Sequence, residues 1–179
     1  MFDPDLIQAA TALLAECRSR GLMLATAESC TGGLIAGVLT EVAGSSDVLD
    51  RGFVTYSNAA KSDMLGVPPE MIETNGAVSG PVAASMASGA LLRSRAALTI
   101  AVTGVAGPGG GSESKPVGTV WFGLAGHGAS PSTERQVFVG DRTAIRQATV
   151  KHALAMLDAA VRNGKTTSAP PPGSPMRPP

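Results

Sequence analysis

A serine lies within a short string of small and polar residues, Ala27-Glu28-Ser29-Cys30-Thr31-Gly32-Gly33. The string follows an apolar stretch typical of a buried strand and precedes a stretch with helical spacing. At such a junction, free backbone N–H groups and the helix dipole favour a negative charge, either a phosphate or a developing oxyanion. Ser29 is therefore a candidate nucleophile and Cys30 a rival one. The alternative is that Ser29 or Thr31 only caps the helix that follows.

A serine nucleophile needs a base, and the sequence favours a lysine over a histidine for that role. His127 and His152 fall in an expected hairpin turn and within the expected last helix, so we interpret both as surface or packing residues. Lys61 follows Tyr56 at the end of an expected strand, and both can face a cleft at the carboxyl ends of the strands. A lysine acts as a base only where burial or nearby cations keep it neutral. The alternative for Lys61 is an exposed helix lysine.

Two other segments carry groups that can bind a ligand. The glycine-rich residues 103–111 follow the most apolar expected strand, and a long loop there is either a binding loop or a flexible connector. Arg142 and Arg146 lie one turn apart at the start of the expected last helix, where they either clamp a phosphate or form a solvated face. Residues 112–115 match an SxxK string, but Pro116 follows at once, so we interpret the match as coincidence.

The elements that must position these residues alternate between strands and helices. Apolar spacing and turn residues predict strands over residues 22–26, 52–57, 98–103, 119–125 and 135–139. They predict helices over 4–21, 33–42, 58–61 and beyond, 68–74, 79–92 and 141–161. Asp3, Asn58 and Asp141 are the predicted N-terminal caps of the first, third and last of these helices. The last two strands are expected to pair antiparallel. This alternation indicates an α/β fold, a three-layer α/β/α sandwich with a mixed, mostly parallel sheet.

The composition limits the class of partner. The chain has 179 residues, of which 44% are hydrophobic and 3% aromatic, and its fourteen acidic and fourteen basic residues cancel. A neutral chain offers no extended positive field for a nucleic acid and no basic face for a membrane. No stretch approaches the ~18 continuous apolar residues of a spanning helix, and no signal peptide is recognised. Cys17 and Cys30 form no CxxC pair, so we expect two free thiols in a cytoplasmic protein.

The last segment differs from the rest of the chain. Residues 163–179 hold six of the thirteen prolines and few apolar residues. Such a composition buries too little surface to offset the entropy of ordering. We therefore expect a folded domain over residues 1–163 and a disordered, proline-rich tail over residues 164–179.

Taken together, the segments resemble the family of the C-terminal domain of the competence/damage-inducible protein CinA, which also occurs as stand-alone nicotinamide-nucleotide amidohydrolases. The resemblance covers roughly residues 5–162 and keeps every motif in order. The matching strings are AESCTGG (27–33), GFVTYSNAAKSDMLGV (52–67), GAVS (76–79), AVTGVAGPGGGSESKPVGTVWFGLA (101–125), and VGDR with the following IR (139–142 and 145–146).

The resemblance implies hydrolytic deamidation of nicotinamide mononucleotide to nicotinate mononucleotide and ammonia. It assigns catalysis to Ser29 as nucleophile, with Lys61 and Tyr56 assisting. The residues expected to bind the substrate or its oxyanion are Thr31, Gly32, Gly33, Ser46, Thr103, Gly104 and Arg142. We expect no metal or other cofactor. The resemblance also implies a homodimer. Two alternatives stay open: an amidohydrolase for another carboxamide, and a non-catalytic nucleotide-binding or regulatory module tied to competence or DNA damage.

Overall fold

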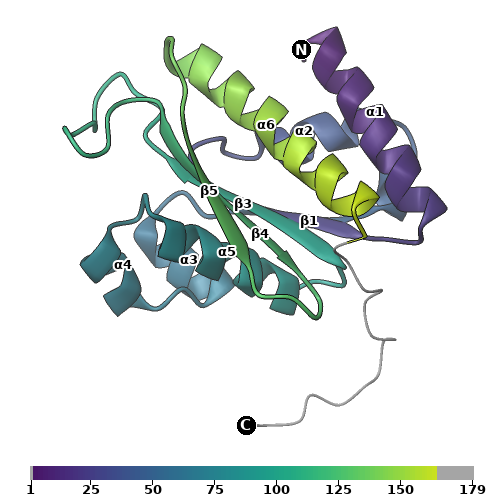
Figure 1. The fold of residues 1–179 in the computed structure, drawn as a ribbon, viewed down its shortest axis with the longest axis horizontal. Coiled ribbons are helices and arrows are strands. Elements are labelled where there is room, and N and C mark those ends of the chain that lie inside the picture. Colours follow the sequence, from purple (N-terminus) through teal and green to yellow (C-terminus); the bar gives the residue numbers. More distant parts are fainter. Residues whose placement is uncertain (1, 165–179) are drawn as a thin grey trace, which may run out of the picture.

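One five-stranded sheet with six α-helices makes up the computed structural model of the chain, which describes residues 2–164 (Figure 1). The strands are β1 (Leu24–Glu28), β2 (Leu49–Val54), β3 (Leu98–Gly104), β4 (Thr119–Gly126) and β5 (Ser132–Val137). The helices are α1 (Pro4–Ser19), α2 (Leu34–Thr40), α3 (Asn58–Leu65), α4 (Pro69–Asn75), α5 (Gly80–Leu92) and α6 (Arg142–Arg162), with a short 3-10 helix, η1, at Ser45–Asp47. The predicted disordered tail lies, from residue 165 on, outside the described residues.

The sheet is mixed, with strand order β2-β1-β3-β4-β5. Strand β1 pairs in parallel with both β2 and β3, whereas β4 is antiparallel to both β3 and β5. Only β4 therefore runs against the other four strands, and the predicted antiparallel pairing of the last two strands is confirmed. The carboxyl ends of β1, β2 and β3 meet at one edge of the sheet, which brings the segments that follow these strands together.

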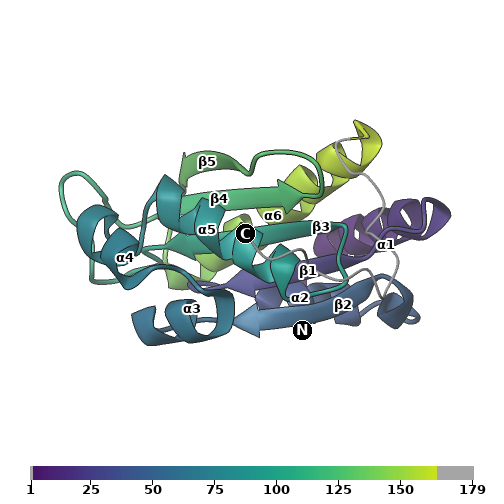
Figure 2. The same ribbon diagram turned by 90° about the horizontal axis from the view of Figure 1, so that it is seen from below.

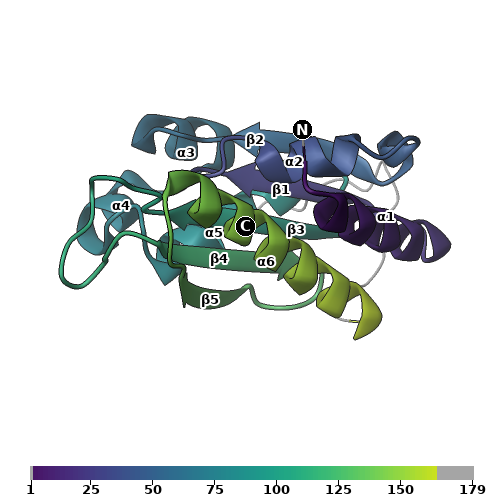
Figure 3. The same cartoon turned by 90° about the horizontal axis from the view of Figure 1, so that it is seen from above.

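Helices cover both faces of the sheet. Helices α1, α2 and α6 pack on one face (Figure 3), and α3, α4 and α5 pack on the other (Figure 2). Each face has its own cluster of buried apolar side chains. All five residues of β1 are buried, as expected for a central parallel strand covered on both faces. The predicted three-layer α/β/α sandwich is confirmed.

The predicted ends of several elements are wrong by a few residues. The edge strands β2 and β5 each begin three residues earlier than predicted, because their residues are mostly exposed or half-buried and give little apolar signal. The predicted caps Asp3 and Asp141 are confirmed, since their side chains accept the N–H groups of Asp5 and Ala144. Helix α3 is capped by Ser57, one residue before the predicted cap.

Candidate active site

The turn from β1 into α2, which we call the Ser29 turn (residues 29–33), lies at the carboxyl edge of the sheet. The Ser29 N–H donates to the Val102 carbonyl at 3.0 Å, which extends the pairing of β1 with β3. The Gly32 N–H donates back to the Ser29 carbonyl at 3.1 Å. Gly32 and Gly33 have φ of 62° and 98°, in the left-handed region that glycine adopts without steric cost. The two glycines therefore let the chain reverse directly after Ser29.

The carboxylate of Glu28 holds this turn from inside the protein. Glu28 is fully buried and accepts hydrogen bonds from the N–H groups of Gly33, Ile35 and Ala36 and from the hydroxyls of Thr26 and Thr31, at 2.7–3.1 Å. A carboxylate suits the N-terminus of a helix because it meets free N–H groups and the positive end of the dipole. Glu28, rather than Ser29 or Thr31, caps α2. The interpretation of Ser29 as a helix cap is therefore wrong, and its hydroxyl is left for other contacts.

Replacing Glu28 by alanine is expected to lower the free energy of unfolding by at least about 3 kcal/mol, because several buried donors lose their acceptor at once. Urea denaturation followed by circular dichroism measures the difference. The matched control is Glu73→Ala on α4, since Glu73 is exposed and its loss should change stability by less than about 0.5 kcal/mol. Equal stabilities of the two variants would show that the Glu28 hydrogen bonds do not stabilise the fold.

Lys61 lies against the hydroxyl of Ser29. Helix α3 carries Lys61 inward, where its side chain is only 1% exposed. Its Nζ donates to Ser29 Oγ at 3.1 Å and to the Thr55 carbonyl at 2.9 Å. Burial lowers the pKa of Lys61 below its ordinary value of 10.5 because the charged ammonium is poorly solvated there. The alternative of an exposed helix lysine is therefore wrong, and Lys61 has the burial and the reach of a general base.

A polar pocket of about 240 Å³, which we call the Ser29 pocket, opens above this pair. It is lined by Ser29, Cys30, Tyr56, Asn58, Lys61, Ala77, Val78, Thr103, Gly104, Ala106 and Arg142. The sequence-predicted residues Ser29, Tyr56, Lys61, Thr103, Gly104 and Arg142 thus come together in one cavity. None of the described residues that line it is a histidine; His152 instead lies 2.9 Å from Glu134. Sequence reasoning missed Asn58, which it assigned as a cap, and Ala77, Val78 and Ala106.

Arg142 and Tyr56 lie together in the lining of the pocket. Arg142 Nη2 donates to Tyr56 Oη at 3.0 Å, and its Nη1 donates to the Gly107 carbonyl at 2.8 Å. Tyr56 is 62% exposed. The arginine therefore ties the segment after β2 to the glycine-rich loop after β3. It also brings a permanent positive charge to the pocket, a charge suited to a phosphate.

Thr103, near the end of β3, holds one wall of the Ser29 pocket in place. Its Oγ1 donates to the Ala77 carbonyl at 2.8 Å, which holds residues 76–79 beside the pocket. These residues are the GAVS string of the sequence, so the string was the signal for Ala77 and Val78. In the SxxK string, the Lys115 amine does not bond to the serine: its Nζ donates to the Asn75 carbonyl, and Ser112 Oγ accepts from the Lys115 backbone N–H instead.

Four residues of the sequence-predicted site lie outside this lining. Thr31 is buried, and its hydroxyl donates to Glu28, while Gly32 and Gly33 use their N–H groups within the turn. Ser46 is exposed in η1, before β2. Because β2 runs parallel to β1 and rises about 3.3 Å per residue, Ser46 lies at the opposite edge of the sheet.

Arg142 and Arg146, for which the sequence left a phosphate clamp and a solvated face open, do not line one pocket. Arg142 lines the Ser29 pocket, but Arg146 does not. Arg146 Nη2 instead donates to the carbonyl of Thr31 at 2.8 Å. One helical turn therefore separates an arginine that faces the cavity from one that supports the turn beside it.

The N–H of Cys30 is the backbone donor of the turn that a ligand can reach. Because the N–H groups of Gly32 and Gly33 already have acceptors, they do not serve the expected oxyanion site. Thr31 is fully buried and does not line the Ser29 pocket. Among residues 2–164, the N–H of Cys30 has no acceptor besides its own thiol, and Cys30 lines the pocket. This group directly follows Ser29 and is the donor best placed for an oxyanion.

Cys30 is a poor nucleophile in this setting. Its side chain is 6% exposed, and burial raises the pKa of its thiol to about 12. Because the thiolate is the reactive form, almost no Cys30 is ionised near neutral pH. Cys17 is also buried, with its pKa raised to about 12 mainly by burial.

The described part of the chain, residues 2–164, shows neither a metal-binding cluster nor a spanning helix. No three His, Cys, Asp or Glu side chains there are grouped so that they could hold a metal ion. None of its helices combines the length and the apolar character needed to cross a membrane.

The fold and the site define an α/β/α protein with a buried serine–lysine pair at the carboxyl edge of its sheet. Residues 7–161 match the CinA C-terminal domain, and the chain belongs to this family. It is 48% identical to nicotinamide-nucleotide amidohydrolase PncC of Escherichia coli K12 over 157 residues, which cover 88% of this chain and 95% of that protein.

Other relatives extend the comparison to longer proteins and to solved structures. A putative competence-damage inducible protein of Symbiobacterium thermophilum is 52% identical over 163 residues, but these cover only 38% of that protein. The crystal structure of competence/damage inducible protein CihA from Agrobacterium tumefaciens superposes with a TM-score of 0.87 at 52% identity. That match covers 90% of this chain and 98% of the other.

Proposed function

We propose that the chain is a nicotinamide-nucleotide amidohydrolase that converts nicotinamide mononucleotide to nicotinate mononucleotide and ammonia. The observation that carries the proposal is the 3.1 Å contact between Lys61 Nζ and Ser29 Oγ at the base of a polar pocket. The name of the E. coli relative, at 48% identity over nearly its whole length, supports the substrate.

In the first half of the reaction, Ser29 forms an ester with the substrate. Neutral Lys61 takes the proton of the Ser29 hydroxyl as Oγ attacks the carboxamide carbon. The N–H of Cys30 donates to the oxyanion of the tetrahedral intermediate, and such a donor is worth about 2.7–4 kcal/mol in the transition state. The C–N bond then breaks, and the Lys61 ammonium returns its proton to the nitrogen, which leaves as ammonia.

In the second half, water releases the acid. Lys61, again neutral, accepts a proton from a water molecule, whose oxygen attacks the ester carbonyl. The bond to Ser29 Oγ breaks, Oγ takes up a proton from the Lys61 ammonium, and the carboxylic acid so formed gives its own proton to water and leaves the pocket as nicotinate. Protons and electrons balance across both halves without a redox partner, since the net reaction is hydrolysis.

We assign the opposite end of the substrate to Arg142. Its guanidinium can bind the phosphate with paired hydrogen bonds. Tyr56 Oη accepts a hydrogen bond from Arg142, and among the described residues it has none to Ser29 or Lys61. We therefore assign Tyr56 to orienting the arginine, in place of the direct catalytic role that the resemblance implied.

Ammonia release from a panel of carboxamides tests the function. We expect turnover of nicotinamide mononucleotide to be much faster than turnover of nicotinamide riboside or free nicotinamide, because only the nucleotide carries the phosphate that Arg142 binds. Binding of the nucleotide by calorimetry without ammonia release would instead support a non-catalytic binding module. Turnover of an unrelated carboxamide, without turnover of nicotinamide mononucleotide, would show that the protein is an amidohydrolase with a different substrate.

A Cys30→Ala variant is expected to keep its ammonia-releasing activity within about threefold of the wild type, because the thiol stays protonated. In the native protein, Ellman's reagent at pH 8 should react with both thiols at least tenfold more slowly than in denaturant. The denatured sample is the matched control. Loss of activity in Cys30→Ala at unchanged melting temperature would make Cys30 the nucleophile.

The oligomeric state and the location stay proposals. We propose a homodimer in the cytoplasm, the state and compartment that the family resemblance and the sequence favour. Light scattering on the purified chain tests the dimer, and a mass equal to one chain at working concentration would contradict it. Cell fractionation tests the compartment.

A further inference from the structure

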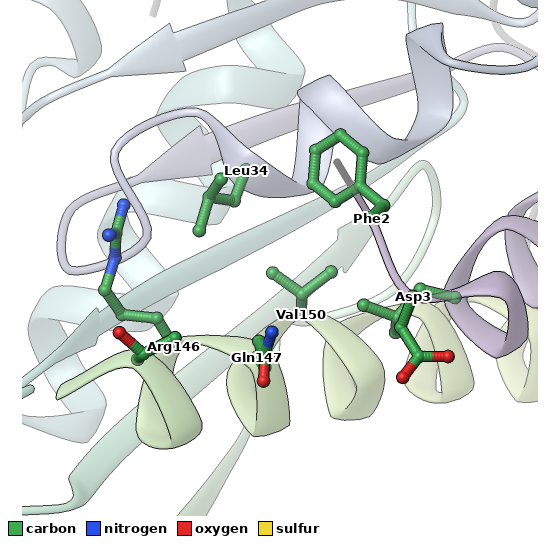
Figure 4. Close-up of a pocket in the computed structure, with 8 residues that line it drawn as sticks. Phe2, Asp3, Leu34, Arg146, Gln147 and Val150 are labelled. Carbon is green, nitrogen blue, oxygen red and sulfur yellow. The ribbon is translucent and has the colours of Figure 1, made fainter. Parts of the chain in front are cut away.

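Arg146 contacts the Ser29 turn without lining the Ser29 pocket. It belongs to α6 and lines a separate, largely apolar pocket with Phe2, Leu34 and Val150 (Figure 4). In Figure 4 its side chain extends from α6 toward the segment that precedes Leu34. There its Nη2 donates to the Thr31 carbonyl at 2.8 Å, across 115 residues of sequence.

The peptide unit that Arg146 contacts is also bonded to Ser29. The carbonyl of Thr31 and the N–H of Gly32 belong to one planar peptide group. Its oxygen accepts from Arg146, and its N–H donates to the Ser29 carbonyl at 3.1 Å. Rotation of this group would therefore break both hydrogen bonds. The guanidinium thus fixes the orientation of the peptide group that donates to the Ser29 carbonyl.

The turn depends on such support because a glycine follows the contact. Gly32 has φ of 62° and no side chain to restrict its rotation. On the other side, the Thr31 hydroxyl donates to the buried Glu28 carboxylate at 2.7 Å. Thr31 is thus held by Glu28 through its side chain and by Arg146 through its backbone. Between Thr31 and Ser29 lies Cys30, which lines the Ser29 pocket.

We propose that Arg146 is a positioning residue, which holds the Thr31–Gly32 peptide and thereby the orientation of Ser29 and of the Cys30 N–H. This proposal rests on the proposed function. Arg142, one turn earlier on the same helix, contacts the substrate instead. The side chain of Arg146 makes one hydrogen bond among the described residues, and its buried Nε has no partner. Because only one hydrogen bond has to be supplied, a lysine at this position should restore the contact with the Thr31 carbonyl in part.

The first test compares Arg146→Met with the matched variant Arg142→Met. For Arg146→Met we expect kcat to fall about 10- to 100-fold, the size of effect that a 1 Å misplacement causes, with KM within twofold of the wild type. For Arg142→Met we expect KM to rise at least tenfold. The decrease in log kcat should be at least one third smaller in Arg146→Lys than in Arg146→Met. A general loss of folding would not give this recovery. Wild-type kcat in Arg146→Met would overturn the proposal.

The second test needs no substrate and separates this proposal from the function. Hydrogen–deuterium exchange resolves the N–H groups of Gly32 and Gly33, which are bonded within the turn. We expect them to exchange at least tenfold faster in Arg146→Met than in the wild type or in Arg142→Met. If the wild type releases no ammonia, the proposed function fails while this exchange still tests the positioning. Unchanged exchange in Arg146→Met would overturn the proposal, whatever its kcat.

Discussion

Replacing Ser29 by alanine is expected to abolish ammonia release from nicotinamide mononucleotide, with a fall in kcat on the order of 10³-fold or more. The substitution removes the atom that, in the proposed mechanism, forms the bond with the substrate. It leaves the turn intact, because Glu28 caps α2 through its own carboxylate. A coupled glutamate dehydrogenase assay measures the ammonia, and its limit of detection sets the lowest residual rate that can be measured.

Two controls make this result specific to the hydroxyl of Ser29. Ser132→Ala, on the exposed edge strand β5, should retain wild-type activity. The substrate affinity of Ser29→Ala, measured by calorimetry, should stay within a few-fold of the wild type, since Arg142, the proposed phosphate ligand, is unchanged. Full activity in Ser29→Ala would exclude an acyl-serine mechanism.

Replacing Lys61 by methionine is expected to lower kcat by about 10²- to 10⁴-fold, the range that a general base contributes. Methionine fills the buried space but cannot accept a proton. Lys61→Arg should be equally inactive, because a guanidinium keeps its charge and its proton at every accessible pH. Lys151→Met, at an exposed position of α6, is the matched control with wild-type activity. An active Lys61→Arg variant would show that the site needs only a positive charge.

The pH dependence follows from the buried position of Lys61. Because its pKa is lowered below 10.5, kcat/KM should rise with pH as the amine loses its proton and level off before pH 10.5. The unfolded chain binds more protons than the folded one between the lowered pKa and 10.5. The free energy of unfolding should therefore increase with pH across that window. Lys61→Met should lack this increase, which denaturant titrations at several pH values measure.

The convergence of the site could be predicted from the sequence because it depends on topology. Ser29, Tyr56 and Thr103 each follow or end a strand, and the carboxyl ends of parallel strands meet at one edge. Lys61 enters the same edge one helical turn after its strand. The alternation of strands and helices was enough to predict the three layers, although the exposed edge strands blurred their own ends.

The roles of Glu28 and Arg146 could not be predicted from the sequence. A glutamate before a nucleophile candidate and an arginine one turn after another arginine are both ordinary surface residues by type. Their functions depend on contacts made after the chain has folded: five donors around one buried carboxylate, and one guanidinium 115 residues away from its acceptor. Sequence spacing carries no information on such pairings.

The measurement that tests the Ser29 mechanism most directly is the capture of its covalent intermediate. Enzyme quenched in acid during turnover of nicotinamide mononucleotide is digested and mapped by mass spectrometry, and a parallel reaction contains hydroxylamine as a trap. We predict that the peptide with Ser29 gains the mass of nicotinate mononucleotide less one water and that the trap yields the hydroxamate. An adduct on Cys30, or the absence of both adduct and hydroxamate, would contradict nucleophilic attack by Ser29.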